Sequence, residues 1–136
     1  MNEESGLKIL EDELTDLEPP YESLNELRIG RLLDQYGIPF FYKQPMIIHH
    51  KGHNKIWKPS FTLPHQGWVV IDYIDDSRKS VLEQKLNVYN YNQVPATVLG
   101  PPDLDKPNWQ ESLYEKLQQN YRRSLSQELS TKYSGR

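Results

Sequence analysis

Two neighbouring segments of this sequence carry residues whose types could support metal or acid–base chemistry. The first is KIWKPSFTLP (residues 55–64), in which Ser60 follows a proline at the end of an apolar strand pattern. The second is WVVIDYI (residues 68–74), an apolar run interrupted only by Asp72. Burying an unpaired carboxylate among such neighbours costs several kcal/mol. We therefore expect Asp72 to have a partner, to bind a metal ion, or to have a raised pKa.

A second acid lies at the start of a predicted helix. Ser23 and Glu26 have the S-x-x-E spacing of a helix capping box. Glu26 also lies three and seven residues before Ile29 and Leu33, so it borders the apolar stripe of that helix. We expect Glu26 and Asp72 to converge on one edge of a sheet.

The elements that must position these residues follow from the periodicity of the sequence. In chain order they are a helix from Ser23 to Tyr36 closed by Gly37, a strand of about ten residues from Phe40, a polar hairpin connection at His49–Asn54, strands at about Lys55–Leu63 and Trp68–Ile74, a helix at about Arg78–Tyr91, a strand at Pro95–Leu99 and a helix from Asn108. Short turns make the first three strands antiparallel neighbours, and the helix after the third is long enough for a parallel crossover. The prediction is an α/β fold with a mixed four-stranded sheet flanked by helices.

A resemblance to the compact members of the PD-(D/E)xK, or restriction-endonuclease-like, nuclease superfamily is carried by the runs ESLNELRIGRLLDQYGIPFFYKQP, KPSFTLP, WVVIDY and VPATVLGPPDL, which lie within residues 22–104. The resemblance implies an αβββαβ core. It also implies hydrolysis of phosphodiester bonds with Mg²⁺ or Mn²⁺ held by acids. The superfamily pattern has an acid on the first helix, an Asp after Pro on the second strand and an acid-x-Lys pair on the third.

Only part of that pattern is present here. Glu26 matches the helix acid and Asp72 matches the acid of the third strand, so these two are the candidate metal ligands. Ser60 stands where the Asp is expected, and Ile74 stands where the Lys is expected. Because Mg²⁺ prefers carboxylate and other oxygen ligands, a neutral serine is a poor replacement for the missing Asp.

Two lysines could replace the missing one. Lys58 shares a strand face with Ser60, and Lys85 on the second helix could reach the same edge. Three interpretations stay open. The first is an eroded site in a module that binds nucleic acid or a partner protein. The second is an active deoxyribonuclease dependent on Mg²⁺ or Mn²⁺, with Lys58 or Lys85 as the displaced lysine. The third is a protein-interaction subunit, including a homodimer, that uses an acidic arm.

Charge is distributed unevenly along the chain. The net charge of −3 argues against a general polyanion binder. Residues 1–22, however, hold eight acids and one base, which leaves fifteen bases and eleven acids in residues 23–136. The body is therefore mildly basic, and basic residues of the last helix are candidates for contact with DNA phosphates: Lys116, Arg122 and Arg123. We predict an acidic arm at residues 1–20, a folded domain at 21–129 and a tail at 130–136.

Other site classes have less support. A cluster of histidines at the hairpin could bind a transition metal, but it lacks the i, i+4 spacing of helical zinc sites, and we expect exposed loop residues: His49, His50 and His53. The three tryptophans are expected in the core: Trp57, Trp68 and Trp109. Without a Walker or G-x-G-x-x-G pattern, no nucleotide cofactor is predicted. The chain lacks cysteine, a long apolar run and a signal-peptide pattern, so a cytoplasmic protein without membrane spans is predicted.

Overall fold

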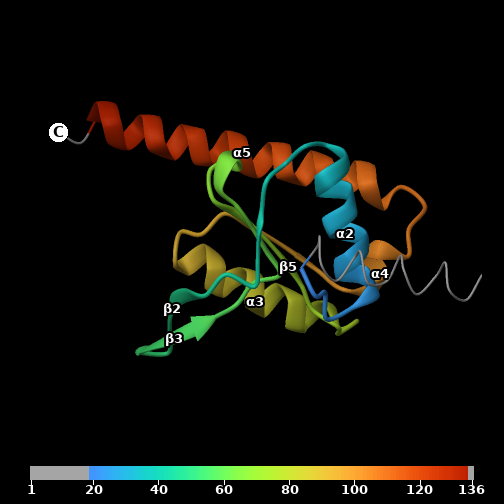
Figure 1. The fold of residues 1–136 in the computed structure, drawn as a ribbon. Helices are drawn as coiled ribbons and strands as arrows, with labels where there is room; N and C mark the ends of the chain where they lie inside the picture. The colour runs from blue at the N-terminus through green and yellow to red at the C-terminus, as the bar shows by residue number, and fades with distance from the viewer. Residues whose placement is uncertain (1–18, 135–136) are drawn as a thin grey trace, which may run out of the picture.

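The computed structural model describes residues 19–134, with helices on both sides of a central sheet (Figure 1). Residues 1–18 of the predicted acidic arm lie outside this range. The helices are α2 (Leu24–Gln35), α3 (Lys79–Tyr91), α4 (Pro101–Leu104) and α5 (Trp109–Ser134), and a 3-10 turn lies at Pro64–Gln66. The strands are β1 (Phe41–Tyr42), β2 (Met46–His50), β3 (His53–Trp57), β4 (Phe61–Leu63), β5 (Val69–Tyr73) and β6 (Ala96–Leu99).

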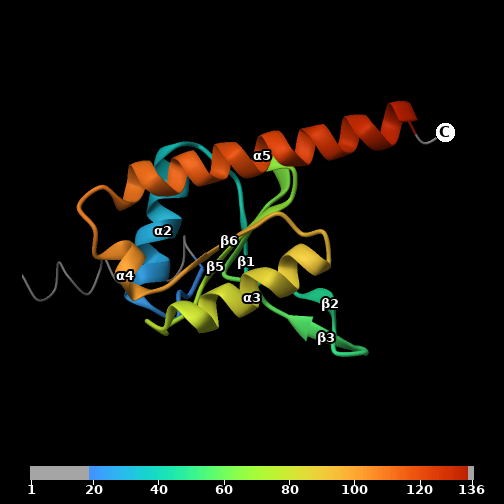
Figure 2. The ribbon, with the colours of Figure 1, turned by 180° about the vertical axis from the view of Figure 1, so that it is seen from behind.

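The main sheet is mixed and has the strand order β1-β4-β5-β6. Strands β1 and β4 are antiparallel, as are β4 and β5, whereas β5 and β6 are parallel and joined through α3. Helices α2 and α5 lie on one side of the sheet and α3 lies on the other (Figures 1 and 2). The prediction of an α/β fold with a mixed four-stranded sheet and flanking helices is confirmed at this level.

Two predicted strands are each broken in two. The strand expected from Phe40 is divided into β1 and β2, and Lys43 between them has a positive φ of 56°. The strand expected at Lys55–Leu63 is divided into β3 and β4 around Pro59. Because Pro45 and Pro59 have no N–H to donate to a strand ladder, both breaks occur where pairing would lose a hydrogen bond. Strands β2 and β3 instead pair with each other as a separate two-stranded hairpin.

The core has two parts, one on each face of the main sheet. Side chains alternate along β5, so Ile71 and its neighbours of the same parity pack with α2 and α5, whereas Val70 packs with Ile48 of the hairpin and Tyr89 of α3. Asp72 has the same parity as Val70. The side chain of Asp72 therefore lies on the α3 face of the sheet, and that of Tyr73 lies on the α2 face.

The ends of the main elements follow the predicted signals in part. Ser23 is the N-cap of α2 and accepts a hydrogen bond from the Glu26 N–H at 3.1 Å, and Gly37 beyond the helix has a φ of +65°. Helix α5 runs to Ser134, through the segment expected as a tail. Trp68 is 58% exposed and stacks on Phe41, so its prediction as a core residue is wrong.

One buried amide ties α5 to the edge of the sheet. The Asn120 side chain donates to Thr97 Oγ1 at 2.8 Å and to the Ala96 carbonyl at 3.4 Å, both on β6. The opposite edge strand, β1, is two residues long.

Within residues 19–134, no helix has the length and apolar character needed to cross a membrane.

Candidate functional site

Asp72 is buried against α3 and is surrounded by hydrogen-bond donors. Its side chain is 4% exposed. Oδ2 accepts the hydroxyl of Tyr89 at 2.6 Å and lies 3.0 Å from the ammonium nitrogen of Lys85. Oδ1 accepts the backbone N–H of Ser60 at 3.3 Å. Of the three outcomes expected for this carboxylate, the structure shows a positively charged partner.

Helix α3 supplies both side-chain partners of Asp72. Lys85 and Tyr89 are four residues apart, so they lie on the same face of the helix. Burial and the adjacent Asp72 carboxylate raise the pKa of Tyr89 well above its ordinary value, which keeps the hydroxyl protonated and donating. Trp57 of the hairpin completes the surroundings, with its ring 4.9 Å from Lys85 Nζ and 5.1 Å from the Tyr89 ring.

Ser60 is a structural link between strands. Its side chain is fully buried. The hydroxyl oxygen accepts the Tyr73 N–H at 3.0 Å and donates to the Tyr73 carbonyl at 3.5 Å. With its donor and acceptor both directed at the β5 backbone, this hydroxyl has no geometry for attack on a substrate or for binding a metal ion.

Glu26 is also buried, at 2% exposure, and has its own set of partners. Oε1 accepts hydrogen bonds from Ser23 Oγ and from the Tyr42 hydroxyl, both at 3.1 Å. Oε2 lies 3.2 Å from Lys43 Nζ. Burial acts to lower the pKa of Lys43, but the hydrogen bond and charge of Glu26 outweigh it, so the pKa is raised. Burial, together with the Glu26 charge, raises the pKa of Tyr42 well above its ordinary value.

The structure does not bring Glu26 and Asp72 together as predicted. Asp72 lies on the α3 face of the sheet, whereas Glu26 approaches on α2 from the opposite side (Figures 1 and 2). Among the described residues, no group of three or more His, Cys, Asp or Glu side chains is arranged to hold a metal ion. The physical reason is the strand parity, which turns Asp72 away from the helix that carries Glu26.

The donor set at each acid does not fit Mg²⁺ or Mn²⁺. These ions require several oxygen ligands in near-octahedral geometry, usually including one or two carboxylates. Asp72 stands beside the Lys85 ammonium, and Glu26 shares the Lys43 ammonium with Glu22, whose Oε2 lies 3.5 Å from Nζ. At each site the lysine occupies the position that a cation would take. An ion at either acid would first have to displace that lysine.

The other predicted site residues are placed as follows. Lys58 is exposed in the loop between β3 and β4, whereas Lys85 reaches Asp72 as the displaced-lysine hypothesis expected. The basic residues of α5 are exposed, on the helix that covers the other face of the sheet from Asp72 (Figures 1 and 2): Lys116, Arg122 and Arg123.

Sequence reasoning missed three residues that complete the two sites: Tyr42, Lys43 and Tyr89. Tyr89 had a signal, because a buried carboxylate needs donors and Tyr89 lies one helical turn after Lys85. Lys43 had none, since its position depends on the positive φ that ends β1.

Comparisons with protein-family models, curated proteins and solved structures find no match for this chain. The resemblance to nucleases therefore remains a prediction from the sequence pattern.

Proposed function

We propose that this chain is a restriction-endonuclease-like domain whose acids have become structural, and that it binds nucleic acid without cutting it. The observation that carries the proposal is the pairing of both candidate metal ligands with lysine. Glu26 Oε2 lies 3.2 Å from Lys43 Nζ, and Asp72 Oδ2 lies 3.0 Å from Lys85 Nζ.

In both pairs the acid is removed from water and the lysine is partly exposed, at 26% for Lys43 and 32% for Lys85. The side chains of the two acids are 3% and 4% exposed. Removing one partner of a buried ion pair leaves an uncompensated charge, which is strongly destabilising. A metal ion would have to meet that cost and replace the Tyr89 hydrogen bond to Asp72 as well.

Binding to nucleic acid is supported by charge and by the sequence pattern. Residues 23–136 carry fifteen bases and eleven acids, an excess that the acidic first segment hides in the total. Lysines and arginines that contact phosphates release counterions, which favours association at low salt. The predicted αβββαβ order also favours nucleic-acid binding, because the restriction-endonuclease-like superfamily that the sequence resembles acts on phosphodiesters.

A second candidate function is favoured by one specific observation. Lys85 stands beside Asp72, so the acid and the lysine of a hydrolytic site are adjacent although the lysine comes from α3. In that alternative, the chain is an active metal-dependent deoxyribonuclease in which Lys85 stabilises charge on the phosphate.

The two functions are separated by assaying cleavage of single- and double-stranded DNA with Mg²⁺ and with Mn²⁺. The parent chain is compared with Asp72→Asn and Glu26→Gln, and DNA binding is measured in parallel over a range of salt concentrations. We expect binding that weakens with salt and no cutting by the parent. Cutting by the parent that is lost in both variants would establish the nuclease and reject the proposal. We also expect the chain to melt at the same temperature with and without Mg²⁺ or Mn²⁺. An ion bound only by the folded chain would raise the melting temperature.

A further inference from the structure

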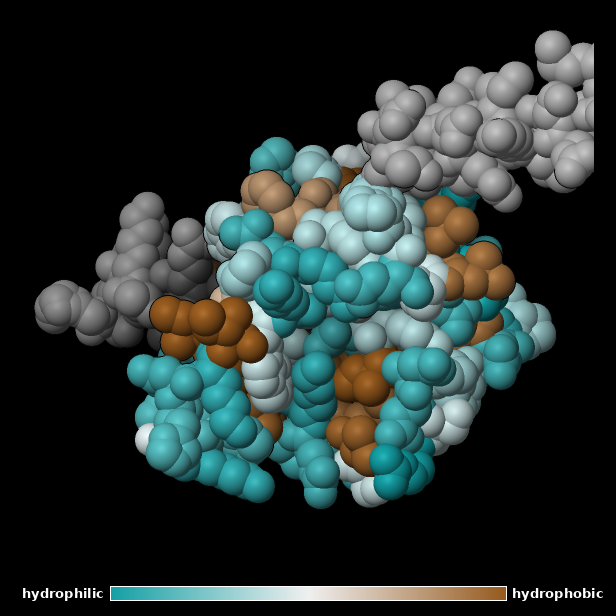
Figure 3. Space-filling model, turned by 60° about the horizontal axis from the view of Figure 1, so that its bottom comes forward, coloured by the Kyte–Doolittle hydropathy of each residue, from teal (hydrophilic) through white to brown (hydrophobic). Residues whose placement is uncertain are grey.

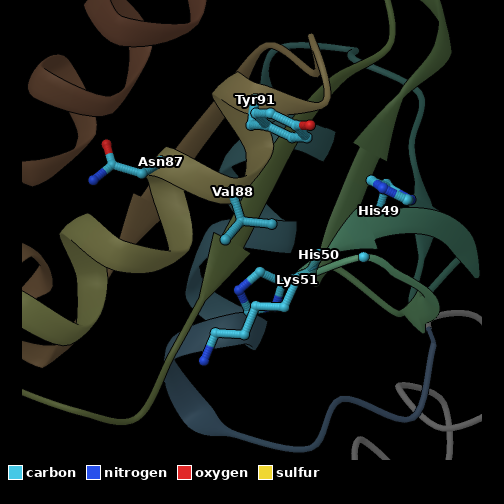
Figure 4. Close-up of a pocket in the computed structure, with 7 residues that line it drawn as sticks. His49, His50, Lys51, Asn87, Val88 and Tyr91 are labelled. Atoms are coloured by element: carbon cyan, nitrogen blue, oxygen red, sulfur yellow. The ribbon is translucent and has the colours of Figure 1, made fainter.

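A groove runs between the β2–β3 hairpin and α3, on the side of the sheet away from α2. It consists of two adjoining hollows with volumes of about 450 and 320 Å³. They share His50 and Lys51 of the hairpin and Asn87 and Val88 of α3. Figure 4 shows the hairpin residues facing Val88 and Tyr91. Figure 3, which brings this side of the molecule forward, shows apolar residues in brown set among polar residues in teal.

The groove is basic on its hairpin side. Residues 46–58 (MIIHHKGHNKIWK) contain three lysines and three histidines and no Asp or Glu. Among the described residues that line the two hollows, none is acidic. Partial burial and the charges of Lys55 and Lys51 lower the pKa of His50, consistent with a positive potential there. On α3, Glu83 is paired with Lys79 at 3.8 Å, and Asp72 beneath the groove is paired with Lys85.

Aromatic rings lie beside these cations. Tyr91 is 74% exposed, and its ring is nearly parallel to that of His49 at 6.4 Å. Trp57 lines the larger hollow, with its ring 4.9 Å from Lys85 Nζ. Base–aromatic stacking next to a basic track is the usual means by which proteins bind single strands.

The hairpin is fixed against α3, so the groove is preformed. Asn92, at the end of α3, donates to the His49 carbonyl at 2.9 Å and accepts the His49 N–H at 2.8 Å. Its amide thereby pairs with β2 as a neighbouring strand would. Ile48, the residue before His49 in β2, is fully buried against the core on this face. A preformed site loses less conformational entropy on binding than a mobile one.

We propose that this groove binds single-stranded nucleic acid, with unstacked bases against Tyr91 and Trp57. The phosphates lie against Lys51, which lines both hollows, and against Lys55, which lies outside them but whose charge acts on His50. The inference rests on the proposed function and deepens it by assigning the surface and the form of the nucleic acid. It differs from the prediction for Lys116, Arg122 and Arg123, which lie on α5 on the opposite face of the sheet. The positive charge of the hairpin favours a polyanion. The flat rings of Tyr91 and Trp57 favour a polyanion whose bases are accessible for stacking.

The test is fluorescence anisotropy of labelled oligothymidine with the full chain, the variant Tyr91→Ala and the double variant Lys51→Ala/Lys55→Ala. Stacking on Tyr91 predicts a roughly 5- to 150-fold loss of affinity in Tyr91→Ala. Loss of two phosphate contacts predicts a slope of log affinity against log salt that is smaller by about 1.4. The matched control is Arg122→Ala/Arg123→Ala, which removes two charges from α5, and we expect it to bind like the parent. All substituted side chains are exposed, so melting temperatures should stay close to that of the parent.

Four results would overturn the inference. If the α5 double variant loses affinity and the groove variants do not, binding lies on α5, and the proposed function survives without the groove. If duplex DNA binds as tightly and is insensitive to Tyr91→Ala, the site does not stack bases. If polyglutamate displaces the oligonucleotide at equal charge concentration, the groove is selective for charge alone. If the parent binds neither single strands nor duplex, the proposed function fails together with the groove.

Discussion

Replacing Tyr89 with Phe removes one hydroxyl from the buried Asp72 site and leaves the ring in place. That hydroxyl donates to Asp72 Oδ2 at 2.6 Å. A hydrogen bond to a charged group contributes about 1.5–3 kcal/mol. Because Asp72 keeps Lys85 and the Ser60 N–H as partners, we expect the lower part of this range, about 2 kcal/mol. For a chain of this size, that loss lowers the melting temperature by roughly 6 °C.

Urea denaturation of the parent and Tyr89→Phe measures the effect, and Tyr91→Phe is the matched control. Tyr91 is two residues away on the same helix and is 74% exposed, so its hydroxyl should contribute less than about 0.5 kcal/mol. A double-mutant cycle with Asp72→Asn should give a coupling energy of roughly 1–2 kcal/mol between the two positions. Equal unfolding midpoints for Tyr89→Phe and Tyr91→Phe, or no coupling to Asp72, would refute the view that this carboxylate depends on its protein donors.

Two further predictions concern the N-terminal end of α3. A Cβ at Gly100 would lie 2.6 Å from the Asp76 carbonyl oxygen. Gly100→Ala should therefore lower the free energy of unfolding by about 1–3 kcal/mol. Urea denaturation measures this, and an unchanged midpoint would contradict the close approach. Hydrogen bonds from Arg78 lower the pKa of Asp76 from 3.8 to about 2, so the carboxylate stabilises the fold above pH 3.8 and loses that effect as pH falls to about 2. Asp76→Asn should therefore melt below the parent at pH 7, with the difference shrinking between pH 3.8 and about 2; a difference independent of pH would contradict it.

The elements with strong periodicity were predictable from the sequence. The capping pair Ser23 and Glu26 located the start of α2, and the apolar run around Asp72 located β5. The parallel pairing of β5 with β6 followed from the length of the intervening helix. The broken strands were not predicted, because the two-residue alternation of side chains continues through Pro45 and Pro59 although the backbone pairing does not.

The sequence predicted individual residues of the two candidate sites but not how those residues are arranged in space. Glu26 and Asp72 were each recognised as acids at the border of the core, and burial of both is confirmed. The prediction that they converge is wrong, because whether two acids meet depends on which helix covers which face of the sheet. The parity of β5 alone cannot supply that information. Lys43 could not be found at all, since it reaches Glu26 only after the chain turns away from β1.

The edges of the main sheet have a consequence for self-association. An exposed strand edge is a template on which another chain can add a strand and start aggregation. Here β1 offers only two residues before the backbone turns at Lys43. On β6, the carbonyl of Ala96 already accepts the side-chain amide of Asn120. A second molecule that adds a strand would find only two residues at the β1 edge and an occupied hydrogen-bond acceptor at the β6 edge. Asn120 therefore has two roles, because it anchors α5 and also hinders pairing of the sheet with a second molecule.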